Sequence, residues 1–176
     1  MLYFIAAYVL LVVSAFVIFM VRERDKSRRK KLNVAAEKIV REDLLVYSLK
    51  NPYAEMNRVE VPSSKRIMIA LNVKAGGKKQ EFVFDPAKQV SIGRGDRNQI
   101  IIHDPAVSDV HALVYLSGRQ VCLSNASPKR KVSLKRGSKQ TGMRPGAVLV
   151  LKNGDVIIVG GYKLYVHLFM FDINYI

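Results

Sequence analysis

The sequence predicts an all-β sandwich over residues 65–176, preceded by an N-terminal segment of a different character. From residue 66 onward, short runs of apolar and β-branched residues are separated by Gly, Pro, Asn and Asp, which is the pattern of strands joined by turns. The runs recur roughly every 8–12 residues with no long helical pattern between them, as in sandwich folds. About 110 residues are enough to bury the core of such a domain.

The first 21 residues predict a transmembrane helix. They contain no charged side chain, and as a helix they would span about 31 Å, which matches the hydrocarbon core of a bilayer. A cleavable signal peptide is disfavoured because no basic residue precedes the apolar run and no small-residue cleavage site follows it. A buried core helix is the other interpretation, but such helices rarely lack charge over this length.

Residues 22–64 predict a basic juxtamembrane segment and a linker. Residues 22–31 include seven basic and two acidic side chains. Because Lys and Arg beside a membrane helix stay in the cytoplasm, we expect a single-pass protein of the cell membrane, with Met1 outside and the C-terminal domain cytoplasmic. These cations would also rest on anionic headgroups, unless they are a solvated charge run. Apolar residues have helical spacing over residues 32–48, Asn51-Pro52 ends that pattern, and the linker ends near Pro62.

The predicted sandwich has about ten to eleven strands. Gly, Pro, Asn and Asp mark the turns between them. The strands that the pattern places are 67–73, 81–84, 90–92, 99–102, 111–116, 120–124, 131–134, 147–151, 155–159 and 163–171.

Residues 90–112 have the most specific pattern in this domain. An apolar run ends at Gly93-Arg94-Gly95, where two glycines flank a cation and a loop begins. An Asn-x-Ile-x-Ile strand follows, and Asp104-Pro105 stops it. Ser108 then stands three residues before His111, at the start of the next apolar run. Two loops therefore flank one short strand.

This ordered set of motifs resembles the forkhead-associated domain, a β-sandwich that binds phosphothreonine peptides. Residues 148–160, VLVLKNGDVIIVG, are similar to the family's late L-x-x-G-D-x-I-x-I-G segment, in which a turn joins the two strands of a hairpin. The resemblance covers residues 66–171. It implies a forkhead-associated-type sandwich that binds a threonine-phosphorylated protein.

The resemblance also implies which residues form the site. In the family, the Arg after the first Gly contacts the phosphopeptide, the Ser of S-x-x-H donates to phosphate, and the His orders the loop. Carried over, these residues are Arg94, Ser108 and His111, with Gly93 also structuring the loop. The residue types suit the ligand, because a phosphate group of about −1.5 to −2 charges needs a cation, hydroxyl donors and backbone N–H groups.

The sequence departs from the family at two places. Asp109 follows Ser108 where the family usually has a basic residue, and a carboxylate there would repel a phosphate that it faced. The loop after strand 120–124 lacks the family's Asn-Gly-Thr. We expect Asn125, Lys129 and Arg130 to join the phosphopeptide site in its place. A basic loop that attracts acidic partners generally is the other interpretation.

Positive charge extends over the whole predicted domain. Residues 65–176 carry 18 basic and 7 acidic side chains, a net charge of +11 out of +15 for the chain. Such a field attracts phosphorylated peptides, anionic membranes and nucleic acids. Nucleic acid is the least favoured of the three, because the predicted domain has neither a stacking platform of aromatic residues nor a recognition helix.

We expect neither an enzyme nor a cofactor or metal site. Ser108 and His111 are not set in a nucleophile elbow, the three histidines are far apart in the sequence, and there is no phosphate-binding Gly-rich loop. The leading hypothesis is a membrane-anchored phosphothreonine adaptor in serine/threonine kinase signalling. The alternative is a phospho-independent interaction module whose basic surface docks acidic partners or anionic membrane.

Overall fold

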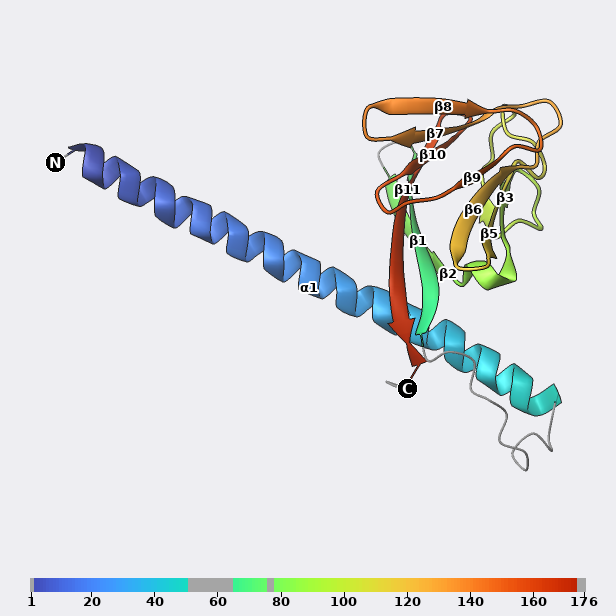
Figure 1. The fold of residues 1–176 in the computed structure, drawn as a ribbon, viewed down its shortest axis with the longest axis horizontal. Helices are drawn as coiled ribbons and strands as arrows, with labels where there is room; N and C mark the ends of the chain where they lie inside the picture. The colour runs from blue at the N-terminus through green and yellow to red at the C-terminus, as the bar shows by residue number, and fades with distance from the viewer. Residues whose placement is uncertain (1, 51–64, 76–77, 174–176) are drawn as a thin grey trace. The chain divides into compact units, whose positions relative to one another are not determined.

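A computed structural model of the chain describes residues 2–50, 65–75 and 78–173 (Figure 1). Within these residues the chain forms the helix α1 (Leu2–Lys50), a 3-10 turn η2 (Pro86–Lys88) and eleven strands. The strands are β1 (Lys65–Ala75), β2 (Lys78–Phe84), β3 (Val90–Gly93), β4 (Ile100–Ile101), β5 (Ala112–Ser117), β6 (Gln120–Asn125), β7 (Val132–Arg136), β8 (Lys139–Met143), β9 (Val148–Val150), β10 (Val156–Val159) and β11 (Tyr162–Asp172).

The strands build two sheets that form a sandwich. Sheet A has the strand order β2-β1-β11-β10-β7-β8, and sheet B has the order β4-β3-β5-β6-β9. Figure 1 shows β1 and β11 running side by side as the longest strands, which agrees with their ten paired positions from Lys65↔Asp172 to Lys74↔Lys163. All pairings are antiparallel except that of β3 with β4. The predicted all-β sandwich is therefore confirmed.

The core lies between the two sheets because apolar residues alternate along the strands. Ile69 and Leu71 from sheet A and Ile92 and Leu123 from sheet B are fully buried there. Since strand side chains alternate between the two faces of a sheet, the residues between these point away from the core. The outward residues of sheet A matter below, because they form a surface of their own.

All ten predicted strands are present, and one further strand was missed. β8 has the sequence KQTGM, in which only Met143 is buried. It forms the edge of sheet A and pairs with β7 from Val132↔Met143 to Arg136↔Lys139. A polar edge strand has no alternating apolar pattern to reveal it, so the sequence signal was absent.

The hairpin predicted for residues 148–160 is wrong. β9 belongs to sheet B and β10 to sheet A, so the Asn153-Gly154 turn carries the chain from one sheet to the other. Gly154 has a φ of 85°, a conformation that suits glycine. Arg136 holds this crossing by donating to the Asp155 carboxylate at 2.8 and 2.7 Å and to the Val150 carbonyl at 2.8 Å. Burial raises the pKa of Asp155, but the hydrogen bonds from Arg136 and from the Lys152 N–H outweigh it and hold the pKa below its ordinary value.

The helix predicted over residues 32–48 is confirmed as part of α1, which is continuous from Leu2 to Lys50. The predicted stop signal Asn51-Pro52 and the predicted linker up to residue 64 lie outside the described residues. The chain divides into two compact units, Met1–Ala35 and Ala36–Ile176. The last turns of α1 therefore belong to the same unit as the sandwich.

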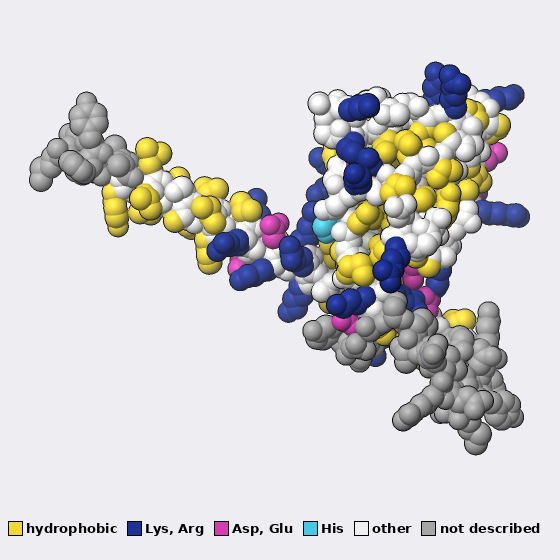
Figure 2. All heavy atoms as spheres, in the orientation of Figure 1, with side chains coloured by type: hydrophobic (Ala, Val, Ile, Leu, Met, Phe, Trp, Pro, Cys, Tyr) yellow, Lys and Arg dark blue, Asp and Glu magenta, His cyan; other side chains and the backbone are white. Residues whose placement is uncertain are grey.

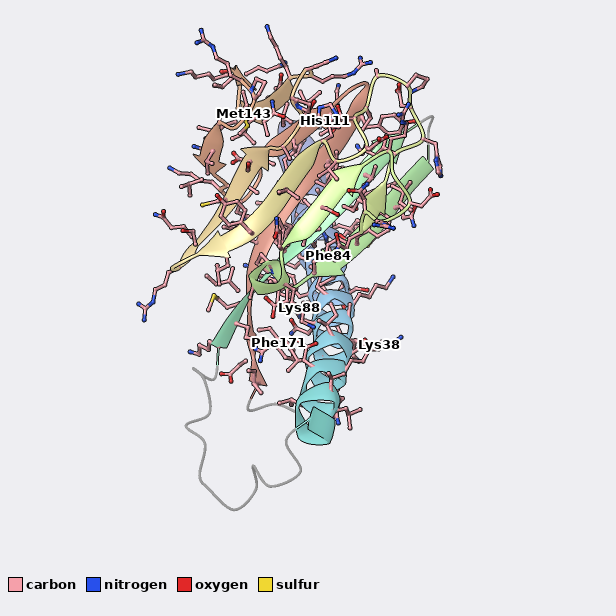
Figure 3. The ribbon with its side chains drawn as sticks, turned by 90° about the vertical axis from the view of Figure 1, so that its right-hand side faces the viewer. Lys38, Phe84, Lys88, His111, Met143 and Phe171 are labelled. Carbon is pink, nitrogen blue, oxygen red and sulfur yellow. The ribbon has the colours of Figure 1, made fainter. Side chains whose placement is uncertain are left out.

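Within that second unit, α1 packs against the outward face of sheet A. Ala36 and Val40 of the helix form a buried cluster with Met68 of β1 and Phe171 of β11. Asp43 adds ion pairs to the cluster, with Arg66 at 3.5 Å and with Lys88 of η2. Figure 3 shows Lys88 and Phe171 beside this part of the helix, with Lys38 on its other side. A helical segment is thus part of the folded domain.

No helix in the described part of the chain is long and apolar enough to cross a membrane. This finding overturns the transmembrane helix predicted over residues 1–21 and the predicted single-pass location in the cell membrane, with Met1 outside and the domain in the cytoplasm.

Candidate functional site

The loops that carry the predicted site residues meet at one end of the sandwich. The Arg94 N–H, directly after β3, donates to the Ser108 carbonyl at 2.9 Å, and the Gly95 N–H donates to the Asp109 carbonyl at 3.1 Å. These bonds hold the β3–β4 loop against the β4–β5 loop. Arg94 and Ser108, fourteen positions apart in the sequence, are therefore brought together, as the sequence predicted.

Gly93 allows the two loops to approach this closely. A Cβ atom at this position would lie 2.2 Å from the Asp109 carbonyl oxygen, so the site has no room for any side chain. Asn98 fastens the same contact, because its Nδ2 donates to the carbonyls of both Gly95 and Asp109 at 2.6 Å. The loop-structuring role of Gly93 stays a prediction, and this close approach of the two loops favours it.

Asp109 lies against Arg94 rather than apart from it. The Arg94 Nη2 donates to the Asp109 Oδ1 at 2.9 Å, and its Nε reaches the same oxygen at 3.3 Å. The side chains are 48% and 77% exposed, so water screens the pair and it contributes only about 0–1 kcal/mol. The guanidinium is thus both accessible to a ligand and partly neutralised by its own chain.

His111 is a structural residue buried beneath these loops. Its Nδ1 accepts the Ser108 N–H at 3.1 Å, which places the imidazole proton on Nε2, where it faces the Lys131 carbonyl at 3.3 Å. Burial lowers the pKa of His111, the Lys131 carbonyl opposes that shift, and the charge of Arg130 adds to it. The ring is therefore neutral, with one tautomer fixed by its two partners. It joins the Ser108 loop to the β6–β7 loop.

The Ser108 hydroxyl forms a hydrogen bond with a second, buried serine. Its Oγ lies 2.7 Å from the Oγ of Ser127, which is fully buried and accepts the Arg130 N–H at 2.9 Å. When Ser127 donates its hydroxyl proton to Ser108, the proton of Ser108 is left for an external acceptor. Ser127 was missed in the sequence because a serine before a proline in a loop has no distinguishing pattern.

Asn125 lies under the β6–β7 loop rather than on its surface. It is buried, its Nδ2 donates to the carbonyls of Arg130 and Met143 at 3.0 Å each, and its Oδ1 accepts the Ser127 N–H at 3.0 Å. Its N–H groups are thus used within the chain. The geometry favours a loop-structuring role over the contact with ligand that the sequence analysis expected.

Comparison with known proteins bears on the fold and the family. Residues 90–160 match the family model of the FHA (forkhead-associated) domain. Over these residues the sandwich is of the FHA type. No curated protein sequence matches the chain. The matched residues run from β3 to β10 and so include the loops of the candidate site.

Among the solved structures that the chain resembles, one FHA domain supports this fold with a TM-score above 0.5. The FHA domain of a hypothetical protein from Arabidopsis thaliana aligns with a TM-score of 0.51 at 18% identity, over 63% of this chain and 92% of that one. The FHA domain of CT664 from Chlamydia trachomatis gives 0.49 at 20% identity, over 57% and 96%. EmbR of Mycobacterium tuberculosis, in complex with a low affinity phosphopeptide, gives 0.47 at 20% identity, over 57% and 24%.

A shallow basic groove of about 400 Å³ lies beside the serine pair of the FHA domain. Arg130 braces it, because its Nη2 donates to the Pro105 carbonyl at 3.0 Å and so ties the β6–β7 loop to the β4–β5 loop. Its lining includes three cations and no acidic residue: Ala106, His111, Lys129, Arg130, Lys131, Ser133, Ile158 and Gly160. Lys129 and Arg130 thus line the groove together with Lys131, while Ser133, Ile158 and Gly160 were not predicted.

The candidate site and the docked helix lie at different ends of the FHA domain. Figure 3 shows His111 and Met143 at one end of the sandwich and Lys88 and Phe171 near the other. On the face shown in Figure 2, Lys and Arg side chains project at many places around the sandwich and acidic side chains are few. An anion approaching the loops therefore meets a positive field.

Proposed function

We propose that this FHA domain binds a phosphothreonine-containing segment of a partner protein at the end of the sandwich where Arg94 and Ser108 meet. The observation that carries the proposal is the hydrogen bond from the Arg94 N–H to the Ser108 carbonyl, at 2.9 Å. It joins the backbone of Arg94, whose guanidinium is exposed, to the backbone of Ser108, whose hydroxyl proton is left for an external acceptor. A phosphate group takes charge-assisted hydrogen bonds from such a pair.

The groove beside the serine pair supports recognition of a second acidic group on the same peptide. Lys129, Arg130 and Lys131 line it without an acidic neighbour, so a carboxylate there would meet only positive charge. A phosphothreonine with a nearby Asp or Glu is therefore the proposed ligand. The role in serine/threonine kinase signalling, in which a kinase supplies this ligand, is part of the same proposal.

A second candidate function is phosphate-independent docking of an acidic protein segment. The ion pair between Arg94 and Asp109 favours it, because a guanidinium that is already partly neutralised attracts a phosphate less strongly. In that case the groove cations would carry the binding. The two functions differ in which residues determine affinity.

Binding of matched phosphorylated and unphosphorylated threonine peptides to the full chain tests the proposal. Arg94→Ala and Ser108→Ala should each lower the affinity for the phosphopeptide roughly tenfold or more, since each removes a charge-assisted bond of about 1.5–3 kcal/mol. Affinity for the unphosphorylated peptide should not change. Thermal unfolding of both variants checks that the loops still fold.

Lys129→Ala provides the contrast. Its exposed cation acts mainly through a screened field, so its loss should weaken binding only a few-fold, and less as salt increases. If Arg94→Ala and Ser108→Ala leave phosphopeptide affinity unchanged while Lys129→Ala abolishes it, the phosphothreonine site is refuted and phosphate-independent docking is the function.

A further inference from the structure

A row of three lysines crosses the outward face of sheet A. In the strand register, Lys79 of β2 lies directly opposite Lys74 of β1, and Lys74 lies directly opposite Lys163 of β11. All three are exposed. Their neighbours along the strands, such as Leu164, face the core, so the lysines share the opposite face.

This lysine row is unfavourable for the isolated fold. Directly opposed positions in an antiparallel pair bring Cβ atoms to roughly 4.5–5.5 Å, and like charges at that spacing destabilise the sheet. Within the described residues, none of the three lysines takes part in an ion pair. Lys74 instead lies over the Tyr165 ring, 4.7 Å from its centroid. In the adjacent row, Glu81 accepts from the Asn72 Nδ2 at 2.6 Å.

The same row continues into the basic groove. Lys163 pairs with Ile158 of β10, and Ile158 pairs with Ser133 of β7. Ile158 and Ser133 are both groove-lining residues. One straight line across the sheet therefore leads from the groove, where Lys129, Arg130 and Lys131 gather, to the three lysines.

The geometry points to an extended binding track for an acidic segment that is continuous with the phosphothreonine on the partner protein. From Ser133 to Lys79 the line crosses four strand-to-strand steps, about 19 Å at roughly 4.8 Å each, which an extended chain of about six residues would span. The partner is identified by charge complementarity and by continuity with the groove. This inference rests on the proposed function.

Peptides with and without an acidic tail test the track on the full chain. In the first set, six Glu residues flank a phosphothreonine on either its N-terminal or its C-terminal side. In the second set, Gln replaces each Glu. The third set contains the Glu and Gln peptides with unphosphorylated threonine. We expect the Glu tail to raise affinity roughly tenfold over the Gln tail on one side only, and the gain to shrink with salt. An equal gain from both sides would indicate unspecific attraction and overturn the inference.

Two triple variants locate the effect. Lys74→Gln, Lys79→Gln and Lys163→Gln together should remove the Glu-tail gain while leaving the affinity for the Gln-tailed phosphopeptide within about twofold. The control removes the same charge from exposed positions off the row, with Arg119→Gln, Lys139→Gln and Lys152→Gln, and should keep most of the gain. A tail gain that survives the lysine-row variant refutes the track.

The two proposals fail in different ways. If phosphate adds nothing to affinity but the lysine-row variant still removes the tail gain, the phosphothreonine site is wrong and an acidic-segment track remains. If the variant loses binding to anionic vesicles or to a single-stranded oligonucleotide but keeps the tail gain, the track has been assigned to the wrong class of partner. Both outcomes are measured with the same purified proteins.

Discussion

At the residue scale, the ion pair between Asp109 and Arg94 bears directly on the proposed phosphothreonine site. A phosphate bound there would share Arg94 with the Asp109 carboxylate and would be repelled by it. Asp109→Asn keeps the size of the side chain and removes the charge. We expect phosphopeptide affinity to rise roughly two- to fivefold, since an exposed pair of this kind contributes about 0–1 kcal/mol.

Asp96→Asn is the matched control, because Asp96 is an exposed acid in the adjoining β3–β4 loop. Both substitutions change the net charge equally, so a general field effect would raise affinity equally. If Asp109 acts specifically, Asp109→Asn should raise phosphopeptide affinity more than Asp96→Asn does. A double-mutant cycle should show that this additional gain in affinity disappears in the Arg94→Ala background. Equal gains from the two substitutions would count against it.

His111 makes the stability of the domain depend on pH. Its folded-state pKa is lowered from 6.5, chiefly by burial, so the unfolded chain binds the proton more readily than the folded chain does. The free energy of unfolding should therefore fall as pH drops below about 6.5, until the folded-state pKa is reached. Denaturant titrations at a series of pH values measure this, and the peptide is left out because phosphate titrates nearby.

Two variants test this: His111→Asn, which cannot titrate, and His103→Asn at an exposed position. His111→Asn should remove most of the change in the free energy of unfolding below about pH 6.5, whereas His103→Asn should keep it. If the wild-type slope persists in His111→Asn, another group causes it.

The motif residues Gly93, Arg94, Ser108 and His111 could be proposed from the sequence because their order is specific. The structure places all four in or beneath the loops at one end of the sandwich. Ser127 and the burial of Asn125 could not be proposed, because which loop serine or asparagine points inward is decided by tertiary packing. The partner of Asp109 was likewise unknown until the two loops were placed.

At the element scale, the last turns of α1 contribute to the stability of the sandwich. Val40 is fully buried against sheet A, whereas the Lys38 side chain is 80% exposed. Val40→Ala should lower the free energy of unfolding by on the order of 2 kcal/mol, from lost burial and the cavity left behind. Lys38→Ala should change it by less than about 0.5 kcal/mol.

Chemical denaturation of the full chain measures both substitutions, and amide exchange over residues 36–50 reports whether the helix is released. Equal effects of the two substitutions would mean that the helix does not pack as described. Phosphopeptide affinity should be unchanged in either variant, since the site lies near the other end of the sandwich.

The elements were predictable where the pattern of apolar residues was strong. Ten strands and the helix over residues 32–48 followed from periodicity, because burial on one face selects the residues. β8 is polar throughout except for Met143, and the turn between β9 and β10 resembles a hairpin turn although it joins two sheets. Local turn chemistry does not specify which sheet the next strand enters.

At the scale of the whole molecule, composition predicted charge but not its arrangement. A net charge of +11 over residues 65–176 was evident from the sequence. That Lys74, Lys79 and Lys163 stand in one row depends on the register of three strands that are distant in sequence. The sequence analysis therefore predicted positive charge over the whole domain but could not place these three lysines in one row.

The docked part of the helix and the binding loops share no residues, so a molecule joined to the chain before residue 36 would leave the loops free to bind. Such a molecule would be linked to a bound partner through one folded unit, which raises the effective concentration of each for the other. Joining two molecules in this way requires no change of shape in the sandwich between them.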